Sequence, residues 1–555
     1  MLLRQAASFL RRIRPPPSRS PSTDPLALPI PKCGRPHEGS HMLRLGGDAG
    51  RKDREEFSWW VVVAAQAAII LGTSSNPAVA DGESIESNSK NNAEAADIVG
   101  LRRIEDGSVV SNIHTAKWRV FTDNGRDSFL QGKLEEAERF FLSALQEAKE
   151  GFGERDPHVA SSCNNLAELY RVMKAFDKAE PLYLEAVNVL EESFGPQDIR
   201  VGVAFHNLGQ FYLAQRKLEE AQIHYERALK IKGRVLGYGH PDYADTMYHL
   251  AMVLHLQGKQ KESEALILDS IRILEEAGQG ESMVCLKRLR HLAQIYLKSS
   301  RLEDAENLQR KILHMLELSK GWHSVETVLA AEGLALTLQT AGKLREAQEL
   351  LERCLEARKT LLKESHIQVA ANMIRLARVG MLISNQLRKI NPAEAIVELD
   401  KAKGFLDNSI RIAREVLNKS VKQRGRLRNG NLAESGNNGR IAMTILLQSF
   451  DSLGLLGLAK QELQESRDEN THLVEAEDAL LQCMSSYKEF VHERSVSGFV
   501  EVKVEYLSCL KHLASLIEDI TREGMQHSQE VTMHELKHEI SQVEKEISQM
   551  RRHKK

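Results

Sequence analysis

Small and large apolar residues of this chain recur at a fixed spacing of 42 positions between about residues 120 and 380. Small residues occupy one phase of this period: Ala137, Ala179, Ala221, Ser263, Ala305 and Ala347. A second phase holds leucine, followed each time by alanine or glycine: Leu166, Leu208, Leu250, Leu292, Leu334 and Leu376. Three residues past that small position stand large side chains: Tyr170, Tyr212, Leu254, Tyr296 and Leu338. A constant period of this length is typical of proteins built from stacked repeats.

The spacing within each unit predicts two helices joined by a tight turn. The first helix carries the leucine and the large residue, and the second helix carries the small residues that allow close helix contact. The turn often holds glycine or a basic residue, as at Gly132, Gly258 and Gly342. Because one helix pair cannot bury its apolar face alone, neighbouring pairs must stack into a continuous core.

Three short segments carry a resemblance to a known family. Residues 164–170 read NNLAELY, residues 178–186 read KAEPLYLEA, and residues 240–242 read HPD. These segments resemble tetratricopeptide repeats, in particular the 42-residue variety of the kinesin-light-chain family. The resemblance implies an all-α, right-handed α-solenoid of helix-turn-helix units. It also implies a concave face, lined by the first helices, that holds peptides or partner proteins.

The 42-residue period predicts an array over residues 116–380, and after Arg378 the register breaks. Residues 381–490 are predicted to form degenerate repeats, interrupted by a Gly/Asn/Arg-rich flexible insertion at 421–440. That basic insertion could contact RNA, but no aromatic residue is interleaved in it, which favours the flexible insertion. Residues 491–555 are predicted to form a capping helix and a short coiled-coil-like helix.

The N-terminal region is typical of a targeting sequence. Residues 1–14 contain four arginines on an amphipathic pattern, and no acidic residue precedes Asp24, which is typical of a transit peptide. Residues 59–71 form a second hydrophobic signal, too short for a spanning helix and followed by a small-x-small motif at 78–80. We therefore expect targeting signals over 1–80 and a polar linker over 81–115.

These signals predict a mitochondrial location, with the chloroplast, including its thylakoid, and then the cytoplasm as alternatives. Residues 59–71 would associate with an inner organelle membrane as a weak anchor, or would be removed with the presequence. A disordered basic tail is the alternative interpretation of residues 1–14.

Charge and cysteine content narrow the function classes. The chain holds 75 Lys and Arg against 77 Asp and Glu, so its net charge offers no basis for nucleic-acid binding. Six cysteines without a Cys-x-x-Cys pair exclude a disulfide-rich scaffold and a cysteine-rich zinc module. Cys163, Cys285 and Cys354 occupy phases that face the core, where cysteine behaves as a small hydrophobic residue.

Residues 534–538 (HELKH) match the H-E-x-x-H pattern of zinc peptidases. Lys537 places a charge at an inner position, and only 17 residues follow His538. The surrounding apolar residues form a coiled-coil-like seam that leaves both histidines on a flanking face: Met533, Leu536, Ile540, Val543, Ile547 and Met550. A zinc peptidase is therefore a remote alternative, and no catalytic residue, metal ligand or cofactor is assigned.

The residue before each periodic leucine is predicted to face the binding groove: Asn165, Asn207, His249, His291, Gly333 and Arg375. Polar side chains in a phase flanked by apolar ones indicate a role beyond packing. Lys287, Arg288 and Asn372 would add polar or positive character, so the groove is expected to prefer extended acidic peptides. Simple solvent exposure of this phase is the alternative.

Together these patterns predict a non-catalytic scaffold or adaptor that binds partner proteins, serving as an organellar assembly or maintenance factor. The alternative is a cytosolic cargo adaptor like a kinesin light chain. Against that alternative, the long N-terminal heptad region that such light chains use to join the motor is missing here, and a presequence-like segment stands in its place.

Overall fold

A computed structural model describes residues 113–424, 432–463, 471–490, 498–522 and 532–552. All regular secondary structure in these ranges is α-helical. The predicted targeting signals at 1–80 and all but the last three residues of the predicted linker at 81–115 lie outside the described residues.

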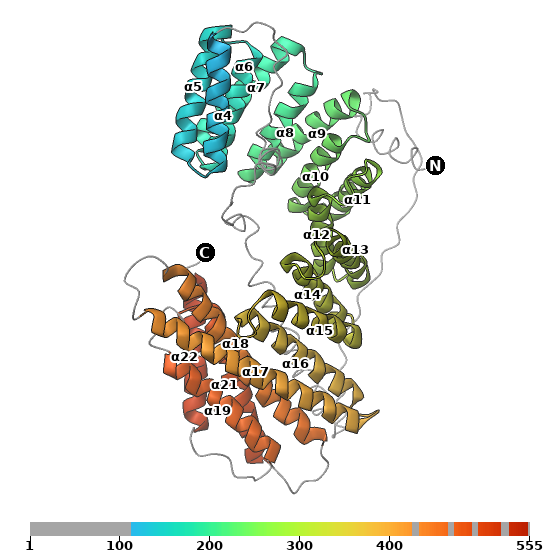
Figure 1. Ribbon diagram of the computed structural model, residues 1–555, viewed down its shortest axis with the longest axis vertical. Coiled ribbons are helices and arrows are strands. Elements are labelled where there is room, and N and C mark those ends of the chain that lie inside the picture. The colour runs from blue at the N-terminus through green and yellow to red at the C-terminus, as the bar shows by residue number, and fades with distance from the viewer. Residues whose placement is uncertain (1–112, 425–431, 464–470, 491–497, 523–531, 553–555) are drawn as a thin grey trace, which may run out of the picture. The chain divides into compact units, whose positions relative to one another are not determined.

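Six consecutive helix pairs follow the 42-residue period, and each helix packs on the next along the chain (Figure 1). The pairs are α4 (Ile113–Leu130) with α5 (Leu134–Phe152), α6 (Pro157–Val172) with α7 (Phe176–Phe194), α8 (Ile199–Ala214) with α9 (Leu218–Val235), α10 (Pro241–Leu256) with α11 (Gln260–Glu276), α12 (Met283–Lys298) with α13 (Leu302–Lys320), and α14 (Val325–Thr340) with α15 (Leu344–Leu361). The predicted all-α fold of stacked helix pairs is confirmed.

The first helix of each unit begins at a polar residue that recurs every 42 positions. Its side chain accepts a backbone N–H bond from the first turn, which satisfies a donor that the helix itself leaves open. The capping residues are Asp156, Asp198, His240, Ser282, Ser324 and His366. Pro157 and Pro241 follow two of these caps, at the first helical position, where no N–H bond is lost.

The turn inside each unit places one residue in the left-handed region of backbone conformation. That residue also recurs every 42 positions, with φ between +58° and +81°: Gly132, Lys174, Arg216, Gly258, Ser300 and Gly342. Glycine adopts this conformation without strain, whereas a side chain incurs a steric cost there. The glycines at this position are thereby explained, whereas Lys174, Arg216 and Ser300 adopt the same conformation at a steric cost.

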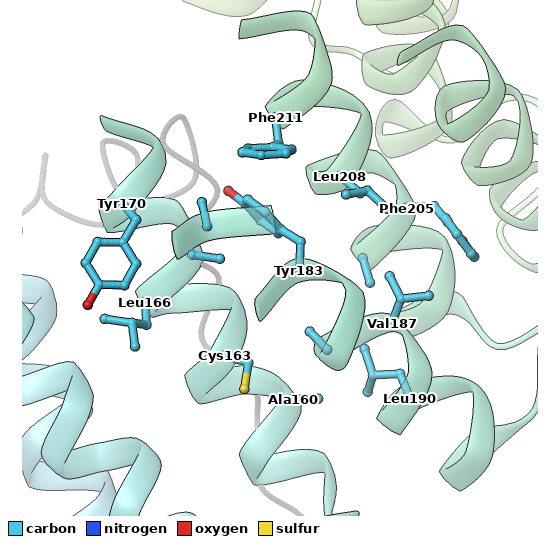
Figure 2. Close-up of a cluster of buried hydrophobic side chains, with 14 of the residues drawn as sticks. Ala160, Cys163, Leu166, Tyr170, Tyr183, Val187, Leu190, Phe205, Leu208 and Phe211 are labelled. Atoms are coloured by element: carbon cyan, nitrogen blue, oxygen red, sulfur yellow. The ribbon is translucent and has the colours of Figure 1, made fainter. Parts of the chain in front are cut away.

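The small residues of the second helices lie at the closest contacts between helices. Ala137, Ala179, Ala221, Ser263, Ala305 and Ala347 are all completely buried. The Ser263 hydroxyl donates a hydrogen bond to the Ala251 carbonyl at 2.7 Å, which satisfies the one polar group in this series. Figure 2 shows the core between α6, α7 and α8, where Tyr183 points toward Phe211. The two rings lie 5.2 Å apart.

Three of the periodic tyrosines join neighbouring units through their hydroxyl groups. Each donates a hydrogen bond to a glutamate of the preceding second helix: Tyr170 to Glu138 at 2.8 Å, Tyr212 to Glu180 at 2.9 Å, and Tyr296 to Glu264 at 3.0 Å. Leu254 and Leu338 stand in the same phase and are buried, so they contribute packing alone.

Beyond α15 the helices become longer, and the 42-residue period ends within α16. The remaining helices are α16 (Ile367–Leu387), α17 (Pro392–Arg424), α18 (Leu432–Leu463), α19 (Thr471–Phe490), α21 (Val500–Arg522) and α22 (Met533–Arg552). The insertion predicted at 421–440 differs from the structure at both ends, because α17 and α18 extend into it. No glycine or proline interrupts residues 405–424, so nothing in that sequence ends α17 earlier.

The helix α18 contains an apolar stretch, Asn438–Leu463, that is long enough to cross a membrane by length and composition. In the apolar 18-residue segment that meets this test, 72% is buried inside the chain. The helix packs against α16, α17, α19 and α21, so its hydrophobicity is that of a core helix. The predicted membrane association of residues 59–71 lies outside the described residues.

The five cysteines in the described part of the chain fall into two groups. Cys163, Cys285 and Cys354 are free and completely buried, as their phase predicts. Burial raises the pKa of the Cys163 thiol to about 12, which makes it unreactive at neutral pH. Cys483 of α19 and Cys509 of α21, in contrast, form a disulfide across a separation of 26 residues. No sequence spacing predicted this pair.

Candidate functional site

The predicted groove residues lie on the first helices, one on each from α6 to α16. These six residues form a row. Contacts between successive first helices connect the row to a second set of polar or aromatic residues, each one position earlier in the sequence than a member of the row. This second set contains Asn164, His206, Tyr248 and Glu332. These second positions were not part of the predicted site. Their signal was a polar or aromatic residue every 42 positions beside the row already named.

At the α6–α8 end of the row the two asparagines are buried. Asn207 donates an amide hydrogen bond to the side-chain oxygen of Asn164 at 2.8 Å. Asn165 is 3% exposed and Asn207 is 7% exposed. The Asn207 amide is therefore fixed by Asn164 and largely buried, so only its small exposed part could hydrogen-bond a partner, with little loss of side-chain entropy.

The middle of the row is a cluster of histidine and tyrosine rings. The His249 ring stacks on Tyr225 at 5.9 Å and meets His206 edge-on at 5.1 Å. Tyr248 contacts the His249 ring on one side and the His291 ring on the other. Ring contacts in this cluster therefore connect α8, α10 and α12 along the row.

Asp245 lies at the centre of this cluster and interacts electrostatically with His206, His249 and Arg288. Burial alone would raise the pKa of its carboxyl, but His249, His206 and Arg288 outweigh burial and the pKa is lowered. Burial lowers the pKa of His249, and Asp245 opposes that effect only in part. His249 therefore presents a neutral ring at neutral pH.

His291 is a member of the row with an unsatisfied ring nitrogen. Burial, followed by the neighbouring His255 and Lys298, lowers the pKa of His291 to about 4. Its Nδ1 atom is buried and has no hydrogen-bond partner among the described residues. A neutral imidazole with an unsatisfied nitrogen favours a hydrogen-bonding partner over an anionic one.

Arg288 was expected to add positive charge to the groove surface, and its position differs from that expectation. The side chain is 1% exposed, and its guanidinium donates to the Asp245 carboxylate at 3.1 Å and to the Ser270 carbonyl at 3.2 Å. Because an arginine buried without a carboxylate would be very unfavourable, the ion pair with Asp245 explains its position. The buried Arg288 side chain supports the row through its ion pair with Asp245.

At the α14–α16 end, Glu332 organises the polar residues. Arg375 pairs with one of its oxygens at 2.6 Å, and the other accepts from Arg358 at 2.7 Å and Asn372 at 3.1 Å. Burial acts to raise the pKa of Glu332, but Arg375 and Arg358 hold it below its ordinary value. Glu332 therefore offsets one of the two arginine charges at this end, and Arg375 is held by an ion pair within the chain.

Gly333 leaves a gap in the row between His291 and Arg375. A methyl group added at its α-carbon would meet no atom within 4 Å, so the space in front of this glycine is open. Gly209, in the small-residue phase of α8, is the opposite case, because a methyl group there would lie 2.9 Å from the Tyr225 ring. The glycine in the groove row is thus not required by packing.

The H-E-x-x-H segment begins α22, and its central glutamate has a structural role. The Thr532 backbone N–H donates to the Glu535 carboxylate at 3.1 Å, and the Glu535 N–H donates to the Thr532 hydroxyl at 3.3 Å. This reciprocal pattern is a capping box. His534 and His538 are exposed, whereas Leu536 is buried in the predicted seam.

Two family models, both described as tetratricopeptide repeat, match the chain. One covers residues 121–192 and 200–276, and the other covers residues 327–368. The chain contains tetratricopeptide repeats over these residues, and proteins with such repeats generally serve as protein-binding scaffolds and are usually non-catalytic. A search among curated proteins finds no match.

Several solved structures are similar to parts of the chain at low identity. A putative kinesin light chain with nearly identical repeats from Podosopora anserina is 21% identical, covers 38% of this chain and 99% of its own, and has a TM-score of 0.34. The apo form of RapI is 12% identical, with coverages of 54% and 98% and a TM-score of 0.35. A Rap protein complexed with competence and sporulation factor is 14% identical, with coverages of 73% and 99% and a TM-score of 0.28.

Proposed function

We propose that this protein is an organellar interaction scaffold that binds an extended segment of a partner protein along the first-helix row from Asn165 to Arg375. This proposal rests on the arrangement of polar side chains in the row. Polar side chains stand in a phase flanked by buried leucines, they are held by one another, and Gly333 leaves open space in front of it.

The chemistry of the row defines the partner more closely. Asn165 and Asn207 offer amide groups, and His291 offers an unsatisfied ring nitrogen, so the row is suited to hydrogen bonds with an extended backbone. Of the two arginines, Arg288 is buried and Arg375 already pairs with Glu332. A preference for acidic residues would therefore rest on Arg375 alone and would be small.

An oxidising compartment is part of this proposal. Disulfides persist in oxidising compartments and are rare in the cytosol, so the Cys483–Cys509 bond supports a location away from the cytosol. The arrangement of a transit peptide and a second hydrophobic signal in residues 1–80 supports delivery into such a space of a mitochondrion, or of a chloroplast with its thylakoid. Separate tags at the two chain ends, imaged in cells, test the location.

Binding along the row is tested by filling the gap at Gly333. Peptides would be selected from a random display library with the full chain, and affinities would be measured by fluorescence anisotropy. Gly333→Trp should weaken binding at least tenfold while leaving the melting temperature unchanged, because the added side chain points into open space. Gly404→Trp on α17 is the matched control, since its surroundings are equally open.

Two further variants separate the parts of the row. Asn207→Ala and His291→Ala should each weaken binding of the selected peptide, because each removes a hydrogen-bonding group. If Gly333→Trp binds the peptide as tightly as the wild type does, the peptide does not occupy this row and the proposal is wrong. Equal losses for Gly333→Trp and Gly404→Trp would also contradict it.

A further inference from the structure

His206 of α8 and Asp245 and His249 of α10 bring three metal-ligating groups to one point. The Nε2 atom of His206 lies 3.7 Å from Asp245 Oδ2, and the Nε2 atom of His249 lies 4.0 Å from the same oxygen. All three atoms lie within 4.8 Å of one another. Asp245 and His249 are four residues apart on one helix, so they share a face.

We propose that His206, Asp245 and His249 form a binding site for a divalent transition-metal ion of the zinc type. Two imidazole nitrogens and one carboxylate oxygen are the donor set that such ions prefer, whereas magnesium and calcium select oxygen ligands alone. Ligands of a tetrahedral zinc ion lie about 3.4 Å apart. The two histidine nitrogens therefore need to move about half an ångström closer to Asp245 Oδ2, and no pair of ligand atoms has to close by more than about 1.4 Å.

The hydrogen bonds around His206 set the ring in the form that a metal requires. The Thr246 hydroxyl donates to the Asp242 carbonyl at 3.2 Å, so its oxygen accepts from His206 Nδ1–H at 3.0 Å. A neutral His206 ring then carries its lone pair on Nε2, the atom that faces Asp245. Such an outer hydrogen bond is the usual means by which proteins orient a metal-binding histidine.

The charge balance also allows a cation. Arg288 occupies the other carboxylate oxygen, Asp245 Oδ1, and leaves Oδ2 to the two histidines. Lys232 is a second positive group that acts on Asp245. The charges of Arg288 and Lys232 both lower the affinity for a further cation, so we expect a reversible site.

The site can be reached from solvent. The side chains of Asp245 and His249 are 36% and 25% exposed, so an ion can enter and one coordination position stays open. Three protein ligands with an open fourth position are the arrangement of metal sites that exchange an outer ligand. Among the described residues, a second group of this kind, His114, Glu147 and Glu150, offers one imidazole and two carboxylates and is therefore less selective for an ion of the zinc type.

The test uses the full chain without an affinity tag, freed of metal with a chelator. Cobalt(II) is titrated and followed by its visible absorption, and zinc(II) is titrated by calorimetry. We expect one ion per chain at this site, with zinc displacing cobalt. The exposed pair His534 and His538 could bind metal weakly, so a double variant with alanine at both positions provides the background for all measurements.

In that background, His206→Ala and His249→Ala should each lower the affinity at least tenfold. Thr246→Val keeps all three ligands and should lower it about 10- to 100-fold, because it removes only the orienting hydrogen bond. His255→Ala, on the same helix but outside the three ligands, should bind as the background does. Circular dichroism melts establish that each variant is folded.

Absence of cobalt absorption in the background chain would overturn the proposal and leave protonated histidines as the partners of Asp245. Equal effects of His249→Ala and His255→Ala would overturn it as well. If both ligand variants unfold, Thr246→Val decides the question alone, with unchanged affinity counting against the site. No peptide is involved, so these results are independent of the test of the groove.

Discussion

The repeat array from α4 to α15 and the C-terminal helices from α16 to α22 are stabilised in different ways. In the array, short helices contact their neighbours through alanine, leucine and tyrosine at fixed phases, and the same capping and turn positions recur. In the C-terminal part, α17 and α18 have 33 and 32 residues, and a disulfide joins α19 to α21.

Buried polar groups show the same difference. In the array some of them repeat with the period, as the tyrosine–glutamate bonds do. In the C-terminal part they form one irregular network, in which Asp451 binds both His512 and Ser508, and Arg378 donates to Ser452. A repeated unit is stabilised by its nearest neighbours, whereas the C-terminal helices depend on contacts that occur only once.

The largest expected effect distinguishes local from shared stability. Phe211→Ala removes a completely buried ring and should lower the free energy of unfolding by about 4 kcal/mol. Because units couple only to their neighbours, hydrogen exchange should accelerate in α6 to α9 while α17 to α21 keep their protection. Ile223→Ala, at an exposed position, is the control. Uniform acceleration along the chain would contradict local coupling.

The disulfide should have the next largest effect, and only in the C-terminal helices. A loop of 26 residues corresponds to about 3.5 kcal/mol of stabilisation in the chain-entropy estimate. A double variant, Cys483→Ala with Cys509→Ala, should therefore lose protection in α19 and α21, and reductant should have no further effect on it. Cys163→Ala, with a free buried thiol in the array, is the comparison. Peptide mapping without reductant that finds both thiols free would disprove the bond.

The two parts should respond to pH with opposite signs. The folded-state pKa of His291 is lowered to about 4 by burial, so its contribution is lost as pH falls from about 6.5 toward 4. For His512, burial lowers the pKa, but Asp451 outweighs burial and raises it above the ordinary value. Its contribution is complete below about pH 6.5 and is lost as pH rises through the folded-state pKa.

Each pKa unit corresponds to about 1.4 kcal/mol, and the partial exposure of His291 reduces its effect. The measurement is hydrogen exchange of each part between pH 4 and 9, corrected for the intrinsic exchange rate. His291→Gln should reduce the loss of protection in the array as pH falls below about 6.5 (the acid limb). His512→Gln should reduce the loss of protection in the C-terminal helices as pH rises (the alkaline limb). The pH interpretation is wrong if either variant leaves its own limb unchanged.

The smallest effect concerns the turns of the array. Lys174 and Ser300 adopt positive φ values that glycine adopts freely. Lys174→Gly and Ser300→Gly should each stabilise the array by about 0.5–1 kcal/mol, because relief of left-handed strain exceeds the added chain entropy. Gly342→Ser, at the same phase, should destabilise by a similar amount. Chemical denaturation measures all three, and a loss of stability in both glycine variants would refute the strain.

Much of the array was predictable because its determinants are local and repeated. A small residue at Ala221 or a leucine at Leu208 has the same neighbours in every unit, so the 42-residue period alone identifies the core. The phase before Leu208 and Leu292 also identified Asn207 and His291 as polar residues between apolar ones. Their partners, such as Asn164 for Asn207, lie in a phase that was overlooked although it has the same period.

The sequence by itself determined the all-α repeat fold, the six units and the phase of the groove row, because helical period and turn chemistry act over a few residues. Only the tertiary structure decided that Arg288 is buried against Asp245, that His206 joins Asp245 and His249, and that Cys483 pairs with Cys509. Each of these contacts occurs once, between helices whose separation and rotation depend on all the packing around them. No periodic pattern along the chain encodes such a contact.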